Sequence, residues 1–266
     1  MRYLPALILA GALSPFCGAQ AYEVTLTFGN QSAAGGAALS PIFIALGNGS
    51  FNPFSSGGVA STAIQTLSET GSGAGLATQF ASVNPTGYGQ EVTASKNSFG
   101  PGIFLPGGSG SVTLNLDPTK NEFLNYYTMV VPSNDYFIGG QIQLFNGSGQ
   151  FLGTNTTLTG SSVWDAGAVV PQIAGAAFLA GNSGTHNTAE SGTIQFINAS
   201  NTSANSFEVY AGQTTADGYV FSNLPNSSSP LLSISAVSAV PLPPAVWLFG
   251  SALSLLGLAQ RRNIAV

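Results

Sequence analysis

The sequence predicts a mainly β protein, an antiparallel β-sandwich with one or two short helices. Three observations favour this fold class. Only 6% of the 266 residues are charged, about a quarter of the share in an average soluble domain, which argues against helix-rich classes of protein. The 34 glycines supply many turns, while 44% of the residues are hydrophobic, enough for a packed core. These hydrophobic residues alternate with polar ones over short segments, as half-buried strands require.

The alternation places the strands. It is clearest at residues 23–28 and 112–116, where every second side chain is hydrophobic. The Asn146-Gly147 pair with Gly149 predicts a hairpin turn, because asparagine and glycine tolerate positive φ angles. Further strands are predicted at Phe123–Val131, Gln141–Phe145, Thr193–Ile197, Phe207–Ala211 and Leu231–Val237.

Two short helices are predicted between the early strands. The hydrophobic residues at positions 60, 64 and 67 share one helical face, and Gly71 lies where a C-terminal cap is expected. A second helix is predicted to hold Leu76, Phe80 and Val83 on its buried face. The helices are too few to change the fold class.

The first segment, residues 1–21, resembles a secretory signal peptide. One positive residue precedes the apolar stretch 4–13, and Ala19-Gln20-Ala21 supplies a small-x-small cleavage site before Tyr22. Cleavage there would remove Cys17, the one cysteine of the sequence, so no disulfide is expected in the mature body. The alternative is a buried N-terminal helix, which leaves the cleavage pattern unexplained.

The last segment, residues 240–266, has the pattern of a membrane anchor. The apolar stretch 245–259 contains Trp247 near its start and is followed by Arg261 and Arg262. An aromatic residue at one interface and basic residues on the cytoplasmic side are typical of a membrane-spanning segment. This predicts that the body, residues 22–239, lies outside the cytoplasm.

The same segment resembles the PEP-CTERM protein-sorting signal of Gram-negative bacteria. The resemblance rests on the order of a box with Pro241 and Pro243, the apolar stretch and the two arginines, with Leu242 in place of the glutamate that names the family. It implies a precursor held transiently in the inner membrane. It also implies partners in the secretion machinery and an exosortase, and release to the cell surface or the exopolysaccharide matrix.

The charges of the predicted body are almost all negative. Without the two end segments it has two lysines and ten acidic residues, a net charge of −8. Sustained binding to nucleic acid needs clustered lysine and arginine residues, so that function is not expected. An acidic body instead favours the binding of cations.

The body, over about residues 22–237, resembles the spondin N-terminal domain family. The most specific matches are Met129-Val130-Val131-Pro132-Ser133-Asn134-Asp135-Tyr136-Phe137-Ile138-Gly139 and Trp164-Asp165-Ala166-Gly167. Weaker matches lie at residues 23–28, 39–41, 58–61, 67–71 and 105–107. The resemblance implies an eight-stranded, C2-like β-sandwich that carries a bound calcium ion and serves in extracellular adhesion.

Three acidic residues fall inside the matched motifs: Glu69, Asp135 and Asp165. Ca²⁺ takes six to eight oxygen ligands, so two or three carboxylates with backbone carbonyls and waters suffice. We expect these three residues to hold one Ca²⁺ ion. The alternative is that each one forms a turn or ends a helix. Ala168-Val169 also replace the Thr-Glu that usually follows in the family, which removes one carboxylate.

Catalytic residues are scarce, so an enzyme is not expected. The one histidine, His186, lies in a predicted loop, and no serine occurs in a Gly-x-Ser-x-Gly turn. Paired carboxylates for glycoside hydrolysis stay open, because a sequence gives no distances. We therefore expect an exported, calcium-stabilised adhesion or binding domain with exopolysaccharide or cell-surface ligands. A metal-free structural matrix protein is the first alternative, and a secreted hydrolase is the second.

Overall fold

The computed structural model describes residues 21–182, 188–197 and 207–239. The predicted signal peptide up to residue 20, the loop with His186 and the sorting segment lie outside the described residues. The sorting segment includes Pro241, Pro243, Arg261 and Arg262. Within the described ranges, no helix is long and apolar enough to cross a membrane.

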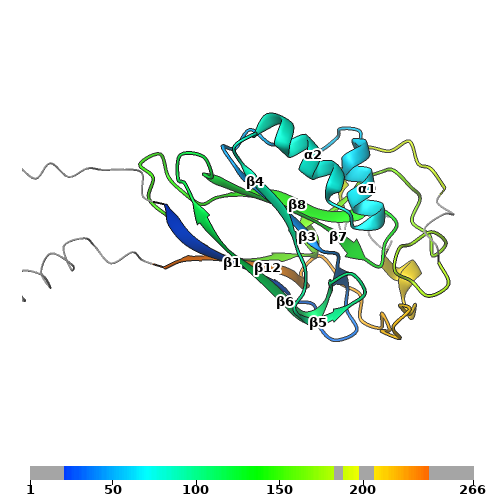
Figure 1. Cartoon of the computed structure of the whole chain (residues 1–266). Helices are drawn as coiled ribbons and strands as arrows, with labels where there is room; N and C mark the ends of the chain where they lie inside the picture. Colours follow the sequence, from blue (N-terminus) through cyan, green and yellow to red (C-terminus); the bar gives the residue numbers. More distant parts are fainter. Residues whose placement is uncertain (1–20, 183–187, 198–206, 240–266) are drawn as a thin grey trace, which may run out of the picture.

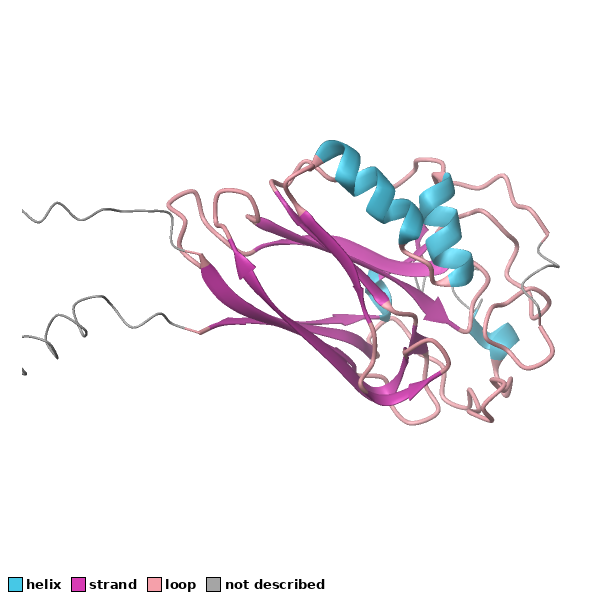
Figure 2. Cartoon of the chain, viewed as in Figure 1, coloured by secondary structure: helices cyan, strands magenta, loops and turns pink. Residues whose placement is uncertain are grey.

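The described chain is mainly β, with one large antiparallel sheet that curls strongly into a half-barrel and two short helices on its outside (Figures 1 and 2). The sheet has twelve strands. The predicted fold class, an antiparallel β protein with two small helices, is confirmed at this level.

One side of the curl consists of five strands, and the other consists of six. The first side, in spatial order, is β9 (Thr154–Thr159), β12 (Pro230–Ser238), β1 (Tyr22–Asn30), β6 (Ile103–Leu116) and β5 (Lys96–Phe99). The second side is β4 (Tyr88–Val92), β3 (Ile42–Gly47), β7 (Phe123–Val131), β8 (Tyr136–Gln143), β10 (Val163–Asp165) and β11 (Gln195–Phe196). The short strand β2 (Ala38–Leu39) pairs with both β6 and β7 and so joins the two sides.

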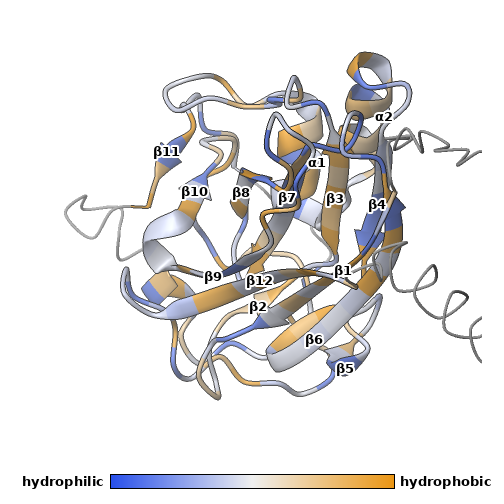
Figure 3. Ribbon diagram, turned by 90° about the vertical axis from the view of Figure 1, so that its left-hand side faces the viewer, coloured by the Kyte–Doolittle hydropathy of each residue, from blue (hydrophilic) through white to orange (hydrophobic). Residues whose placement is uncertain are grey.

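The main hydrophobic core fills the space between the two sides of the curl. Figure 3 views this arrangement with β12, β1 and β6 below and β3, β7 and β8 above. The alternation predicted for β1 is confirmed, because Val24, Leu26 and Phe28 are fully buried in this core. Thr25 and Thr27 lie on the opposite face, where Thr25 pairs with Thr113 of β6.

A second core lies between the sheet and the helices α1 (Thr62–Thr70) and α2 (Ala74–Val83). The helices supply five buried hydrophobic side chains, and β3, β7 and β8 supply, among others, Phe43, Tyr127 and Phe137. The buried hydrophobic residues of the helices are Ala63, Ile64, Leu67, Leu76 and Phe80. Both predicted helices are confirmed. Val83 is an exception because α2 ends there, and its side chain is 49% exposed.

Three strand predictions need correction. The segment predicted as a strand at 207–211 forms a 3₁₀ turn at 207–210, because its buried side chains, Phe207 and Tyr210, are three residues apart. The strand predicted to begin at Gln141 begins at Tyr136, and the strand predicted at 193–197 is limited to β11. The sequence did not predict β3, since all six of its residues are buried and give no alternation.

Gly71 caps the C-terminus of α1, and replacing it is expected to destabilise the protein. Its φ angle is +75°, and a Cβ atom there would lie 2.7 Å from the Cβ of Ser40. We expect Gly71→Ala to lower the free energy of unfolding by about 1–2 kcal/mol for the left-handed backbone alone, with a further loss from the contact with Ser40. Gly57→Ala is the matched control, because Gly57 has a φ of +78° and open space around it.

Chemical denaturation of both variants measures the difference. We expect a larger loss of stability in Gly71→Ala than in Gly57→Ala, and equal losses would show that the Ser40 contact does not matter.

Candidate functional site

The structure brings Asp135 and Asp165 together at one edge of the sheet. Asp135 directly precedes β8, and Asp165 is the last residue of β10. These two strands pair antiparallel, with Asp165 opposite Tyr136, and the amide of Ala166 donates a hydrogen bond to the backbone carbonyl of Asp135 at 3.1 Å. Two of the three predicted site residues therefore come from adjacent strands and lie side by side.

The carboxylate of Asp135 is fully buried, and only one of its two oxygens accepts hydrogen bonds. Its Oδ2 atom accepts hydrogen bonds from the backbone N–H groups of Ala168 at 2.8 Å and Val169 at 3.1 Å. Its Oδ1 atom is also buried but accepts no hydrogen bond from the described residues. Asp165 is partly buried, and its Oδ1 accepts from the N–H of Gly167 at 2.7 Å. The backbone of residues 167–169 therefore serves both carboxylates.

A close approach of two backbone segments fixes this loop. Gly167 has a φ of +63°, and a Cβ atom there would lie 2.8 Å from the carbonyl carbon of Gly192. The N–H of Gly192 donates to the carbonyl of Gly167 at 3.0 Å, and the N–H of Glu190 donates to the carbonyl of Ala168 at 2.8 Å. These contacts place the segment around Glu190 beside the two aspartates.

Burial and nearby negative charges raise the pKa of both aspartates. The pKa of Asp135 rises to about 8, first because of burial and then because of the negative charges of Asp165 and Glu190. The two N–H bonds to Asp135 act in the opposite direction but are outweighed. The pKa of Asp165 rises to about 6, mainly through burial, while the bond from Gly167 opposes the rise. Neither carboxylate has a basic partner in the described structure, where the one ion pair joins Lys120 and Asp117.

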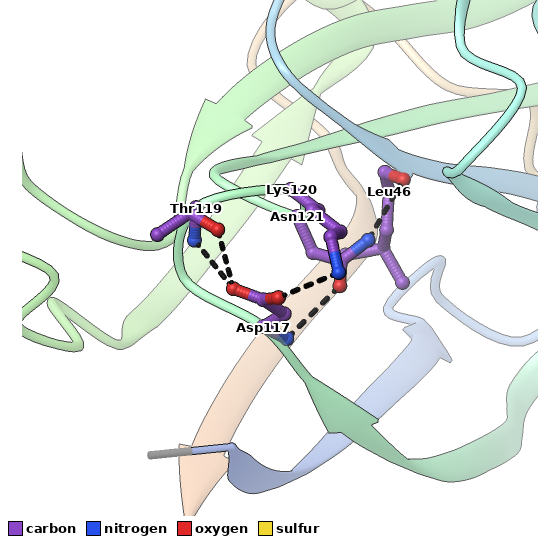
Figure 4. Close-up of polar contacts among 5 residues, drawn as sticks. All are labelled: Leu46, Asp117, Thr119, Lys120 and Asn121. Carbon is purple, nitrogen blue, oxygen red and sulfur yellow. Dashed lines mark hydrogen bonds and ion pairs between the residues drawn. The ribbon is translucent and has the colours of Figure 1, made fainter. Parts of the chain in front are cut away.

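Asp117 shows what an acidic turn former looks like in this protein (Figure 4). Its Oδ1 accepts from the backbone N–H of Thr119 at 2.9 Å and from the Thr119 hydroxyl at 2.7 Å, and its Oδ2 lies 3.0 Å from the Nζ of Lys120. Asn121 completes the turn by linking the Asp117 amide to the Leu46 carbonyl. These partners hold the pKa of Asp117 down at about 2. Asp135 differs in each respect: it is buried, its Oδ1 has no hydrogen-bond partner, and its pKa is raised.

Glu69 does not join the two aspartates. It lies in the last turn of α1 and is partly exposed, and burial alone raises the pKa of its carboxyl. Among the described residues, no group of three or more histidine, cysteine, aspartate or glutamate side chains could hold a metal ion. The predicted three-residue set therefore reduces, in the structure, to the pair Asp135 and Asp165.

Glu190 is the residue that sequence reasoning did not assign to this site. It raises the pKa of both aspartates by its charge, although its own side chain is exposed. No local pattern in the sequence links Glu190 to the Asp165 motif. Its position depends on backbone pairing with residues 167–168, which the sequence pattern does not reveal.

The donor set is compatible with a hard cation. The free Oδ1 of Asp135 and the neighbouring Asp165 carboxylate are oxygen ligands of the kind that Ca²⁺ prefers. Two carboxylates are fewer than the six to eight ligands that Ca²⁺ takes, so backbone carbonyls and waters would have to supply the others. No protein-family model matches the sequence, and the search of curated proteins found no relative.

Proposed function

We propose that the chain is an exported adhesion or binding protein whose β domain is stabilised by a Ca²⁺ ion held by Asp135 and Asp165. One observation carries this proposal. The Oδ1 atom of Asp135 is buried without a hydrogen-bond partner, beside a second carboxylate and without a basic residue. An unpaired buried charge is costly unless a cation or a proton neutralises it.

The ion would act through its charge and its position. It would allow both carboxylates to stay ionised, and it would connect the start of β8 to the end of β10. The backbone bonds to residues 167–169 hold the two side chains in place for this role. The site would contribute to stability, because an ion that binds the folded state alone shifts the folding equilibrium.

Export and adhesion rest on the sequence. The signal-like segment 1–21, the sorting-like segment 240–266 and the charge-poor body support delivery to the cell surface or the exopolysaccharide matrix through an exosortase. The resemblance to spondin domains supports adhesion, and the finer description of the fold as a C2-like, eight-stranded sandwich belongs to this proposal. Two sides of one sheet that enclose a shared core are compatible with that description.

Thermal unfolding with and without calcium tests the proposal. We expect the melting temperature to rise with added CaCl₂ and to fall in excess EDTA, because the ion binds the folded state. At a calcium concentration of about 100 times the dissociation constant, the gain is about 2.7 kcal/mol. Superimposable melting curves in CaCl₂ and EDTA would contradict the calcium site.

A metal-free structural matrix protein is the second candidate. It is favoured by the raised pKa of Asp135, about 8, because a protonated carboxyl at neutral pH needs no cation. The backbone bonds to Oδ2 would then satisfy half of a neutral group. This candidate predicts that calcium has no effect on stability at pH 7.

A further inference from the structure

A cavity of about 250 Å³ lies on the second side of the curl, apart from the two aspartates. Its residues come from β7, β8 and the loop that follows β3. The loop supplies Asn52, Phe51 and Phe54, while β7 and β8 supply Tyr127, Asn125 and Gln141. Pockets for drug-sized ligands have volumes of roughly 300–1,000 Å³. The cavity is therefore the size for one small ring.

Three side-chain amides line this cavity, and several of their hydrogen-bonding positions are open. Asn125 is fully buried and already engaged, since its Nδ2 donates to the carbonyl of Ala45 at 3.3 Å and its Oδ1 accepts from Gln141 Nε2 at 3.1 Å. The Oε1 of Gln141 accepts no hydrogen bond from the described residues. The side-chain amide of Asn52 is exposed and also has no described partner. These two side chains offer one acceptor and a complete amide to a ligand.

Tyr127 adds an unpaired hydroxyl. The residue lines the cavity and is only 2% exposed, yet its hydroxyl makes no hydrogen bond to any described residue. Burial raises the pKa of this hydroxyl above its ordinary value, so it is a neutral donor and acceptor. A tyrosine hydroxyl can both donate and accept a hydrogen bond. A ligand with hydroxyl groups would therefore find a hydrogen-bond partner in it.

Aromatic rings form the apolar part of the cavity. Phe51 and Phe54 both pack edge-on against Tyr127, with ring centroids 6.0 Å and 6.2 Å away. Phe54 is fixed further by edge-on contacts with Phe137 and Trp164. The rings are therefore held rigidly and suit a ligand that has an apolar face as well as polar groups.

The cavity has no charged lining residue. A charged ligand would lose its hydration without gaining a counter-charge, which is unfavourable. Amides, a neutral hydroxyl and rigid rings together match a sugar, which presents C–H groups on its faces and hydroxyls around its rim. From these contacts we infer that the cavity binds one ring of an uncharged saccharide. This inference rests on the proposed function as a binding domain but does not depend on calcium.

Ligand-observed saturation-transfer NMR on the full chain tests the inference. The probes are the methyl glycosides of glucose, galactose, mannose and N-acetylglucosamine, with glucuronate as the charged comparison. We expect at least one neutral probe to receive saturation and glucuronate to receive none. Absence of transfer to all four neutral probes, or stronger transfer to glucuronate, would overturn the inference.

Two variants and one matched control locate the binding. Gln141→Ala removes an amide at the cavity, and Tyr127→Phe removes the hydroxyl alone. Each is expected to weaken binding about fivefold, the loss of one net hydrogen bond of about 1 kcal/mol. Gln143→Ala is the control, because Gln143 is an exposed glutamine of the same strand outside the cavity. Unchanged affinity in both cavity variants, or an equal loss in the control, would contradict this location.

The two proposals can fail separately. If sugar binding persists in EDTA and the melting temperature does not change with calcium, the calcium proposal is wrong and the saccharide proposal still stands. If the melting temperature depends on calcium but no sugar binds, the saccharide proposal is wrong and the calcium proposal still stands.

Discussion

Asp135→Asn is expected to stabilise the calcium-free protein at pH 9. At this pH the wild-type carboxyl is ionised in a fully buried position, where Oδ1 has no hydrogen-bond partner. Asparagine keeps the shape and one oxygen, which accepts from the amides of Ala168 and Val169 as Oδ2 does now. Its amide nitrogen then takes the place of the unpaired oxygen beside the Asp165 carboxylate. The substitution therefore removes an uncompensated charge and adds a donor.

The size of this effect follows from the cost of an unsatisfied buried group. We expect a gain of about 2 kcal/mol, which corresponds to a rise of roughly 4–8 °C in melting temperature for a domain of this size. In saturating calcium the order is reversed, because asparagine is a weaker ligand than an ionised aspartate. Circular dichroism melts in EDTA and in CaCl₂ measure both effects.

Asp117→Asn is the matched control for this experiment. It makes the same chemical change at a turn where the carboxylate accepts two bonds from Thr119 and pairs with Lys120. This variant should be no more stable than the wild type in either solution. A loss of stability in Asp135→Asn that is the same in EDTA and in CaCl₂ would show that the charge of Asp135 does not destabilise the calcium-free protein.

The second large effect is a fall in stability with rising pH in the absence of calcium. The pKa values of Asp165 and Asp135 are about 6 and about 8 in the folded protein, both above the ordinary value of 3.8. Between pH 4 and 8 the folded protein therefore keeps protons that the unfolded chain has released. Stability is then highest near the acidic end of this window and declines as the pH rises through 6 and 8.

Melting temperatures in EDTA from pH 5 to pH 9 test this sign. We expect a steady decrease in the wild type and a flatter profile in Asp135→Asn, in which the group with the higher pKa no longer titrates. Saturating calcium should weaken or reverse the decrease, since the ion binds the deprotonated carboxylates. Asp117 does not interfere, because its pKa of about 2 places its effect below this pH range. A melting temperature in EDTA that increases from pH 5 to pH 9 would contradict the described electrostatics.

The sequence predicted those parts of the fold in which a local pattern is complete. The alternation in β1 and the boundaries of β7 agree with the structure. So do the two helices and the cap at Gly71. It did not predict β3 or the curl of the sheet. A strand buried on both faces has no alternation, and the short strand β2 that joins the two sides has only two residues.

The candidate site was predictable only in part for a related reason. Asp135 and Asp165 lie in two distinctive motifs, but their proximity is set by the register between β8 and β10. The exclusion of Glu69 and the approach of Glu190 likewise depend on tertiary contacts. No sequence pattern predicted the cavity at Tyr127, because Asn125 and Gln141 lie on different strands and become neighbours only when β7 pairs with β8.

Calorimetric titration of CaCl₂ into the EDTA-treated and desalted protein tests the central claim most directly. The account predicts one bound Ca²⁺ per chain in the wild type and in Asp117→Asn, and loss of this binding in Asp135→Asn and Asp165→Asn. No measurable binding to the wild type, or binding that both site variants retain, would contradict a calcium site at Asp135 and Asp165.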